Sequence, residues 1–306
     1  MIKLLLLSGF LGAGKTTLMT NILNSFAQEK VGVIINEFGE AGVDGTLLTR
    51  DGIKMQELNN GSIFCACLKQ SFLQSLIDMS RQDISHLFIE PSGLADPSDM
   101  GKILDTIKPM LDAEYDYRGV VSVIDAETFP RLSQVLPALV RQVEYCGAAI
   151  INKADLVDAA RIEELTQMIS DLNPDCEIIV TSFCRFDIAA LCERLCIANQ
   201  DARESTNTPE TRLYSTVLKP VHGGNICIDA LRRFVQELST HTYRIKGFLP
   251  VDGGVVAVSA VGSVINIEDW TTPPPNLGLV VISAIGISIV SKITTALETS
   301  GLELNL

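Results

Sequence analysis

The residues best suited to chemistry stand near the start of the chain, in the run Gly9-Phe-Leu-Gly-Ala-Gly-Lys-Thr16. Glycines here let successive backbone N–H groups point toward the α- and β-phosphates of a nucleotide, while Lys15 reaches the β- and γ-phosphates and Thr16 binds Mg²⁺. An apolar run precedes the glycines and a helical pattern follows them, as a phosphate-binding loop requires. A glycine-rich turn that binds nothing is the alternative. The predicted phosphate-binding residues are Gly9, Gly12, Ala13, Gly14, Lys15, Thr16 and Thr17, with Lys15 also catalytic.

A second motif, Asn152-Lys153-Ala154-Asp155, directly follows an apolar run that ends at Ile151. It matches the N-K-x-D motif of GTPases, in which a carboxylate accepts hydrogen bonds from two guanine nitrogens. Adenine cannot supply both donors, and a buried acceptor left unpaired costs about 1–3 kcal/mol. The motif therefore predicts guanine selectivity, with Asn152, Lys153 and Asp155 as binding residues. A helix cap formed by Asp155 is the alternative.

A carboxylate at the end of another apolar run completes this set. Glu90 is followed by Pro91-Ser92-Gly93. An acid at such a strand end, beside a phosphate-binding loop, can hold Mg²⁺, and Gly93 can turn its N–H toward the γ-phosphate. Glu90 is therefore predicted to be a catalytic and Mg²⁺-binding residue. The alternative is an acid stabilised by a neighbouring helix terminus.

Short apolar runs alternate with helical patterns through the first two thirds of the chain. The runs are too short for helices and too uniformly apolar for half-exposed strands, which favours a parallel sheet covered on both faces. Strand and helix alternation of this kind predicts a doubly wound α/β fold. The predicted strands span 2–7, 31–35, 86–89, 119–124, 148–151 and 177–181. The predicted helical stripes lie within 18–26, 72–79, 103–111, 132–143 and 165–172.

The pattern changes after residue 198. Residues 199–210 are polar without periodicity and read as a linker, which leaves a first domain of 1–198 and a second of 211–306. The second is predicted to be a small α+β domain, with a hairpin turn at Asp252-Gly253-Gly254. Its predicted strands span 214–218, 244–251, 255–267 and 279–283, and its helices 228–238 and 287–299.

Composition limits the function classes. Hydrophobic residues at 47% and charged residues at 20% are ordinary for a folded protein. Lys plus Arg number 24 and Asp plus Glu 37, so 24 − 37 gives a net charge of −13, which disfavours nucleic acid and anionic membranes as partners. No apolar run is long enough for a membrane span. The eight scattered cysteines predict free thiols in a reducing compartment, and we expect a cytoplasmic protein.

Together these motifs resemble the CobW family of P-loop GTPases. The similarity is tight over the first half and looser after the linker, where Arg244-Ile-Lys-Gly-Phe248 and Trp270 are similar to landmarks of the CobW C-terminal domain. The matching motifs are Ser8-Gly-Phe-Leu-Gly-Ala-Gly-Lys-Thr-Thr17, Asn36-Glu-Phe-Gly-Glu40 with Asp44, Glu57-Leu-Asn-Asn-Gly61, Glu90-Pro-Ser-Gly-Leu-Ala-Asp-Pro97 and Asn152-Lys-Ala-Asp155.

The resemblance implies a slow GTPase that uses GTP and Mg²⁺ and delivers a metal or metallocofactor to a client metalloprotein or cofactor enzyme. Within the family's acidic segment, Glu37 is the residue we expect to link nucleotide and metal, and we count it as catalytic. The family's C-x-C-C motif is incomplete here, since Ser62 takes its first position and only Cys65 stays in register. Cys67 is our own addition, so the predicted transition-metal ligands are Glu37, Cys65 and Cys67, with Zn²⁺ or Co²⁺ as candidates.

The incomplete motif leaves a second function open. Two thiolates need further ligands to hold zinc, and cysteine is also a common small apolar core residue. A metal-independent GTPase switch that assists assembly or reactivation of a cofactor enzyme, such as a corrinoid enzyme, is therefore the alternative. A small-molecule kinase is weaker, because N-K-x-D has no role there. The oligomeric state is left open, including a homo-oligomer.

Overall fold

The computed structural model describes residues 1–36, 53–58, 69–91, 93, 95–195, 213–221, 226–262, 264–271, 274 and 276–306. These residues fall into two compact units, one within residues 1–195 and one within residues 213–306. The predicted linker 199–210 lies outside the described residues. Among the helices that the structure describes, none has the length and apolar character needed to cross a membrane.

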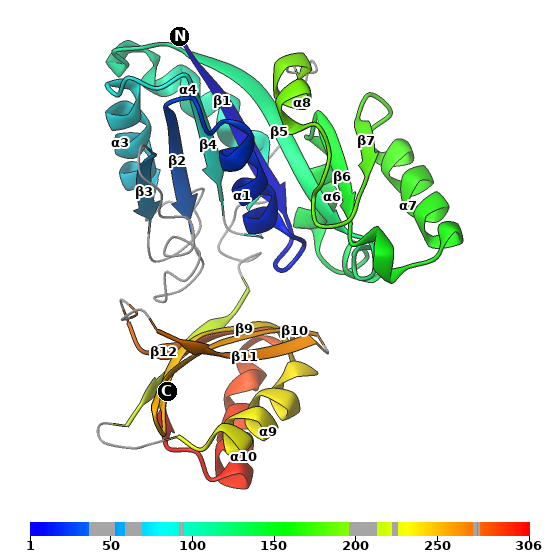
Figure 1. The fold of residues 1–306 in the computed structure, drawn as a ribbon. Helices are drawn as coiled ribbons and strands as arrows, with labels where there is room; N and C mark the ends of the chain where they lie inside the picture. Colours follow the sequence, from blue (N-terminus) through cyan, green and yellow to red (C-terminus); the bar gives the residue numbers. More distant parts are fainter. Residues whose placement is uncertain are drawn as a thin grey trace. The chain divides into compact units, whose positions relative to one another are not determined.

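Seven parallel strands form the sheet of the N-terminal unit, which confirms the predicted fold class (Figure 1). Their order is β3-β2-β4-β1-β5-β6-β7, so β1 lies in the centre, between β4 and β5. Because all strands run the same way, their carboxyl ends meet at one edge of the sheet. The strands are β1 Ile2–Gly9, β2 Val31–Asn36, β3 Lys54–Leu58, β4 His86–Glu90, β5 Tyr115–Asp125, β6 Ala148–Asn152 and β7 Glu177–Val180.

Both faces of this sheet are buried. Leu5 and Leu7 of β1 share a core with α1 and α8, while Leu4 and Leu6 are fully buried on the opposite face. Figure 1 shows α1 and α8 on the same face of the sheet. Burial on both sides explains why residues 4–7 of β1 form an unbroken apolar run. The helices are α1 Lys15–Ser25, α3 Lys69–Ser80, α4 Met100–Ile107, α5 Phe129–Leu132, α6 Pro137–Glu144, α7 Ala159–Leu172 and α8 Ile188–Arg194.

The structure differs from the predicted list of elements at several points. Strand β3 is not among the predicted strands, because it is only five residues long, lies at the edge of the sheet and carries the polar residues Lys54 and Gln56. The stripe at 132–143 is two helices, since Pro137 starts α6 and cannot continue α5. The predicted strand 255–267 is likewise two strands, β10 and β11, with a turn at Gly262, whose φ is +57°.

The C-terminal unit is an antiparallel six-stranded sheet with two helices on one face (Figure 1). This confirms the predicted α+β class, although only four strands were predicted. The order is β11-β10-β9-β12-β8-β13, and β9 and β10 form the hairpin predicted around Asp252. Gly247 has φ +154°, and a Cβ there would lie 1.9 Å from the carbonyl oxygen of Gly278, so only glycine fits. The elements are β8 Ser215–Pro220, α9 Ile228–Ser239, β9 Thr242–Val251, β10 Gly254–Val261, β11 Val264–Trp270, β12 Gly278–Ser283, α10 Ile289–Ser300 and β13 Leu304–Asn305.

Candidate functional site

The glycine-rich run forms the tight connection between β1 and α1. Gly9 has φ +132°, and a Cβ on it would lie 2.3 Å from the carbonyl oxygen of Val123 in β5. Gly12 and Gly14 also have positive φ, at +78° and +117°. L-residues with side chains rarely adopt these angles. The three glycines therefore have a conformational reason to be glycine, and the chain turns directly into the N-terminus of α1.

Lys15 lies inside this connection. Its side chain is 5% exposed, and its Nζ donates a hydrogen bond to the carbonyl oxygen of Phe10 at 3.2 Å. The backbone N–H of Ala13 donates to the same oxygen, also at 3.2 Å. Thr16 is half-buried and Thr17 is exposed in the first turn of α1. A buried ammonium thus lies at the start of a helix, where the backbone dipole also favours an anion.

Asn152 joins this loop to two other segments. Its Nδ2 donates to the carbonyl oxygen of Ala13 at 2.9 Å, and its Oδ1 accepts from the N–H of Cys184 at 3.0 Å. The side chain is 3% exposed, and a Cβ on Gly14 would lie 2.4 Å from its Nδ2. Both ends of the amide are thus bonded to protein backbone, and Asn152 acts in the structure as a brace.

The residues after Asn152 form a fixed turn. Lys153 adopts the left-handed conformation at φ 62°, and its Nζ forms an ion pair with Asp125 Oδ2 at 2.5 Å. The other oxygen of this 4%-exposed carboxylate accepts from the N–H groups of Glu127 and Thr128. Asp155 follows with an exposed side chain. The Asp125 pair therefore fixes the turn that presents Asp155 at the carboxyl edge of the sheet.

A loop after β7, which the sequence motifs did not identify, completes this edge. Phe183 and Cys184 have φ of 58° and 52°, and both of their carbonyl oxygens accept from Asn21 Nδ2 of α1 at 2.9 Å. Ser182 Oγ accepts from the N–H of Asp155 at 3.1 Å. Burial raises the pKa of Cys184 to about 12, so its thiol stays protonated. The signal that could have found this loop is its position directly after a predicted parallel strand.

Glu90 and Gly93 lie on the other side of the glycine-rich loop. Glu90 ends β4, which neighbours β1, and its side chain is 4% exposed. Gly93 lies against the loop, since a Cβ on it would be 2.7 Å from the backbone nitrogen of Leu11. Gln142 of α6 donates to the carbonyl oxygens of Gly93 and Ala95 at 3.2 and 3.1 Å. No motif marked Gln142, which holds this segment from a distant helix.

The predicted transition-metal ligands Glu37, Cys65 and Cys67 lie outside the described residues. Within the part of the chain that is described, no group of three or more His, Cys, Asp or Glu side chains could hold a metal ion. Strands β2 and β3 pair in register up to Asn36 and Leu58, which are the last described residues before the segments that carry the three predicted ligands. The metal-ligand prediction therefore stays a prediction.

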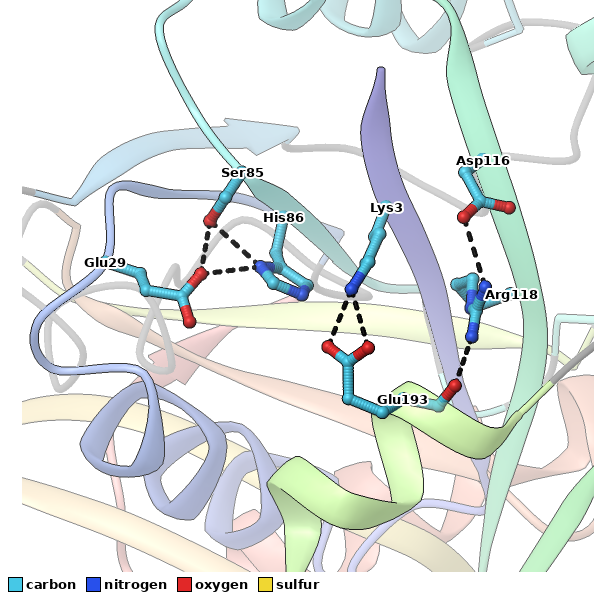
Figure 2. Close-up of polar contacts among 7 residues, drawn as sticks. All are labelled: Lys3, Glu29, Ser85, His86, Asp116, Arg118 and Glu193. Carbon is cyan, nitrogen blue, oxygen red and sulfur yellow. Dashed lines mark hydrogen bonds and ion pairs between the residues drawn. The ribbon is translucent and has the colours of Figure 1, made fainter.

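A separate polar cluster lies at the opposite, amino-terminal edge of the sheet (Figure 2). Lys3 of β1 pairs with Glu193 of α8 at 2.6 Å, and Arg118 of β5 bonds Asp116 and the carbonyl oxygen of Glu193. His86 Nδ1 lies 3.1 Å from Glu29, but burial lowers its pKa below the usual 6.5. Burial outweighs the attraction of the carboxylate, and this histidine is neutral near pH 7.

Comparisons with known proteins match each of the two units to a known domain family. Residues 3–180 match the family described as CobW/HypB/UreG, nucleotide-binding domain, and residues 220–298 match the cobalamin synthesis protein cobW C-terminal domain. The zinc chaperone YjiA of Escherichia coli is 32% identical over 197 residues, which are 62% of this chain and 60% of YjiA. The zinc chaperone YeiR of the same organism is 25% identical over 311 residues, or 91% of this chain and 92% of YeiR.

Among solved structures, a Zn(II)-bound triple mutant of the YjiA GTPase has a TM-score of 0.50 to this chain. The sequence identity is 22%, and the superposition covers 99% of each chain. At this identity the likeness concerns the fold. The sequence match to YjiA spans three fifths of that relative's length.

Proposed function

Because the chain belongs to the CobW/HypB/UreG nucleotide-binding family and carries the CobW C-terminal domain, we propose that it binds and hydrolyses GTP to deliver a metal or metallocofactor to a client protein. The observation that best supports nucleotide binding is the pair of hydrogen bonds that Asn152 makes. It ties the glycine-rich loop to the loop after β7, beside the turn that bears Asp155. Three segments suited to phosphate and base are thus held together at one edge.

In the proposed site, backbone N–H groups of residues 9–14 and the N-terminus of α1 hold the phosphates. Lys15 neutralises charge that develops on the transferring phosphoryl group. The hydrogen bond from Lys15 Nζ to the Phe10 carbonyl oxygen keeps the ammonium inside the loop. When a nucleotide binds, its phosphate oxygens compete with the Phe10 oxygen for this ammonium. Asp155, held by the turn that Lys153 and Asp125 fix, accepts hydrogen bonds from guanine.

Magnesium fits the oxygen donors available here. The Thr16 hydroxyl and the Glu90 carboxylate are hard ligands, which Mg²⁺ prefers together with water and phosphate oxygens. When bound, the ion would neutralise negative charge on the phosphates. Gly93 is proposed to turn its N–H toward the γ-phosphate, with Gln142 holding the segment on its far side. We expect slow turnover, because the sequence identifies no arginine that would stabilise charge on the transferring phosphoryl group. Arg118, one candidate for that role, is bonded at the opposite edge of the sheet.

The cargo is proposed to bind Glu37, Cys65 and Cys67. Two of the similar proteins are named zinc chaperones, which supports Zn²⁺ as cargo, and Co²⁺ stays the second candidate. Thiolates and a carboxylate suit either ion, and an open site lets the cargo leave. The incomplete cysteine motif, with Ser62 at its first position, is the observation that favours the alternative of a metal-independent switch for a cofactor enzyme.

GTP hydrolysis by chelated protein, titrated with one metal at a time, tests the proposal. We expect Zn²⁺ or Co²⁺ to change both the hydrolysis rate and the affinity for GTP, because coupling between two sites is reciprocal in affinity. The matched variants are Cys65→Ser with Cys67→Ser, and Cys227→Ser as the control thiol, which is exposed in the C-terminal unit. Coupling that survives the double variant places the metal elsewhere.

Two further outcomes separate the alternatives. Full activity and GTP-dependent client binding by metal-stripped protein would favour the metal-independent switch. Absence of any calorimetric signal for GTP with Mg²⁺, from folded protein, would refute the nucleotide site itself.

A further inference from the structure

Two cysteines that the proposed function does not use are in contact at the amino-terminal ends of β6 and β7. The Sγ atoms of Cys146 and Cys176 are 3.3 Å apart, although the residues are 30 positions apart in sequence. Cys146 lies in the turn that leads from α6 into β6, and Cys176 lies in the turn that leads from α7 into β7. These strands are parallel neighbours with Ala148 paired to Glu177. Their amino ends therefore meet, and the two thiols meet there with them.

The backbone around the pair is fixed by several hydrogen bonds. Asn173 Nδ2 donates to the carbonyl oxygen of Cys146 at 2.8 Å and to that of Val143 at 2.9 Å. The Cys176 N–H donates to the Asn173 carbonyl oxygen at 3.2 Å, and the Glu177 N–H donates to the Gly147 carbonyl oxygen at 3.0 Å. The contact between the two sulfurs thus follows from the register of the sheet and does not depend on a loose loop.

The two thiols are not equivalent. Cys146 is 1% exposed, and its hydrogen bond with Cys176 together with burial raises its pKa. The same hydrogen bond lowers the pKa of Cys176, which is half-buried and so within reach of small solutes. A more acidic, more accessible sulfur beside a buried thiol is the arrangement of an attacking and a resolving cysteine.

We propose that Cys146 and Cys176 are a reversible redox pair, oxidised by hydroperoxides to a disulfide. The Cys176 thiolate attacks one peroxide oxygen, the O–O bond breaks, and Cys176 becomes a sulfenic acid as hydroxide leaves. The Cys146 thiol then attacks that sulfur, and its proton leaves with the hydroxyl group as water. In sum, two thiols and one hydrogen peroxide give one disulfide and two waters, and two electrons pass from sulfur to oxygen.

The geometry is compatible with the bond. A disulfide needs about 2.0 Å between sulfurs, so the sulfurs must approach by little more than 1 Å from their present 3.3 Å. Small dithiol reductants would restore the thiols by exchange. The bond would tie edge strand β7 to β6 at the edge of the sheet away from Asn152 and Asp155. Oxidation of this pair therefore requires no nucleotide and no cargo.

Peptide mapping of the whole chain after peroxide treatment tests the proposal. Reduced protein is treated with hydrogen peroxide, remaining thiols are alkylated, and the chain is cleaved with trypsin and a protease that cuts after glutamate. Cleavage after Glu177 separates Cys176 from Cys184, which otherwise share a tryptic peptide. We expect a peptide cross-linked between Cys146 and Cys176, reversed by dithiothreitol. Cys227, an exposed thiol in the other unit, reports general oxidation.

Two variants assign the order of the steps. In Cys146→Ser we expect a sulfenic acid on Cys176, trapped by a cyclic diketone, and in Cys176→Ser we expect Cys146 to stay alkylatable. Loss of Cys227 thiol while both pair members stay alkylatable would overturn the proposal, as would cross-links from either to another cysteine. The wild-type map decides this even if a variant does not fold. GTP hydrolysis is not the readout, so failure of the proposed function leaves this test unaffected.

Discussion

Removal of the Asn152 side chain tests whether the brace prepares the nucleotide site before binding. Asn152→Ala removes two buried hydrogen bonds, to the Ala13 carbonyl oxygen at 2.9 Å and from the Cys184 N–H at 3.0 Å. The Ala13 carbonyl oxygen and the Cys184 N–H each lose a partner, and leaving a buried backbone group unpaired costs about 1–3 kcal/mol. For the two groups together we therefore expect the free energy of unfolding of the N-terminal unit to fall by about 2–6 kcal/mol.

The same substitution should weaken GTP binding. Without the brace, the glycine-rich loop and the loop after β7 each sample other conformations, and binding free energy must order them. If ordering the two loops reduces the binding free energy by about 1.4 kcal/mol, the affinity for GTP falls about tenfold. The loss should be similar for GTP and GDP, because the two bonds that are lost join Asn152 to the backbone of Ala13 and Cys184 and not to the γ-phosphate, in which the two nucleotides differ.

Asn173→Ala is the matched control. Asn173 is also a part-buried asparagine in the N-terminal unit, and its Nδ2 bonds to the carbonyl oxygens of Val143 and Cys146 at the opposite edge of the sheet. It should lower stability without changing GTP affinity. Stability is measured by urea titration followed by circular dichroism, and affinity by calorimetry at a temperature where both variants are folded. Wild-type GTP affinity in Asn152→Ala, with stability lowered as in the control, would refute the reasoning.

Three further outcomes are expected. Lys15→Ala should lower the GTP hydrolysis rate by about 10²-fold or more, because a preorganised cation at the phosphoryl group is lost; normal single-turnover rates would contradict this. Asp155→Asn should bring the affinities for GTP and xanthosine triphosphate closer together, and undiminished preference for GTP in competition assays would count against the base-reading role. As pH falls below 6.5, stability should decline by up to about 1.4 kcal/mol per pH unit, because the unfolded chain protonates His86 before the folded chain does. Urea midpoints of wild type and His86→Gln between pH 7.5 and 5 check this, and parallel pH profiles would exclude His86 as the source.

The sequence alone determined the fold class and the elements that position the site. Uniformly apolar runs predicted buried parallel strands, since burial on both faces removes the alternation of polar and apolar residues. The glycines at 9, 12 and 14 were identifiable from their spacing between an apolar run and a helical pattern, and their positive φ angles explain why glycine is needed there. Elements at the margins were less readable. Edge strand β3 carries Lys54 and Gln56, so its composition resembles a loop.

The tertiary structure alone decided how the segments contact one another. Asn152 reads as part of a base-binding motif, but its amide is bonded to Ala13 and Cys184. The loop at Phe183 carries no motif of its own and is marked only by its position after a predicted strand, and nothing in the sequence pointed to the contact between Cys146 and Cys176. All of these depend on which strands are neighbours and in what register they pair. An unbroken apolar run fits several registers equally well, so its residues cannot encode that choice locally, and only the packing of the whole sheet fixes it.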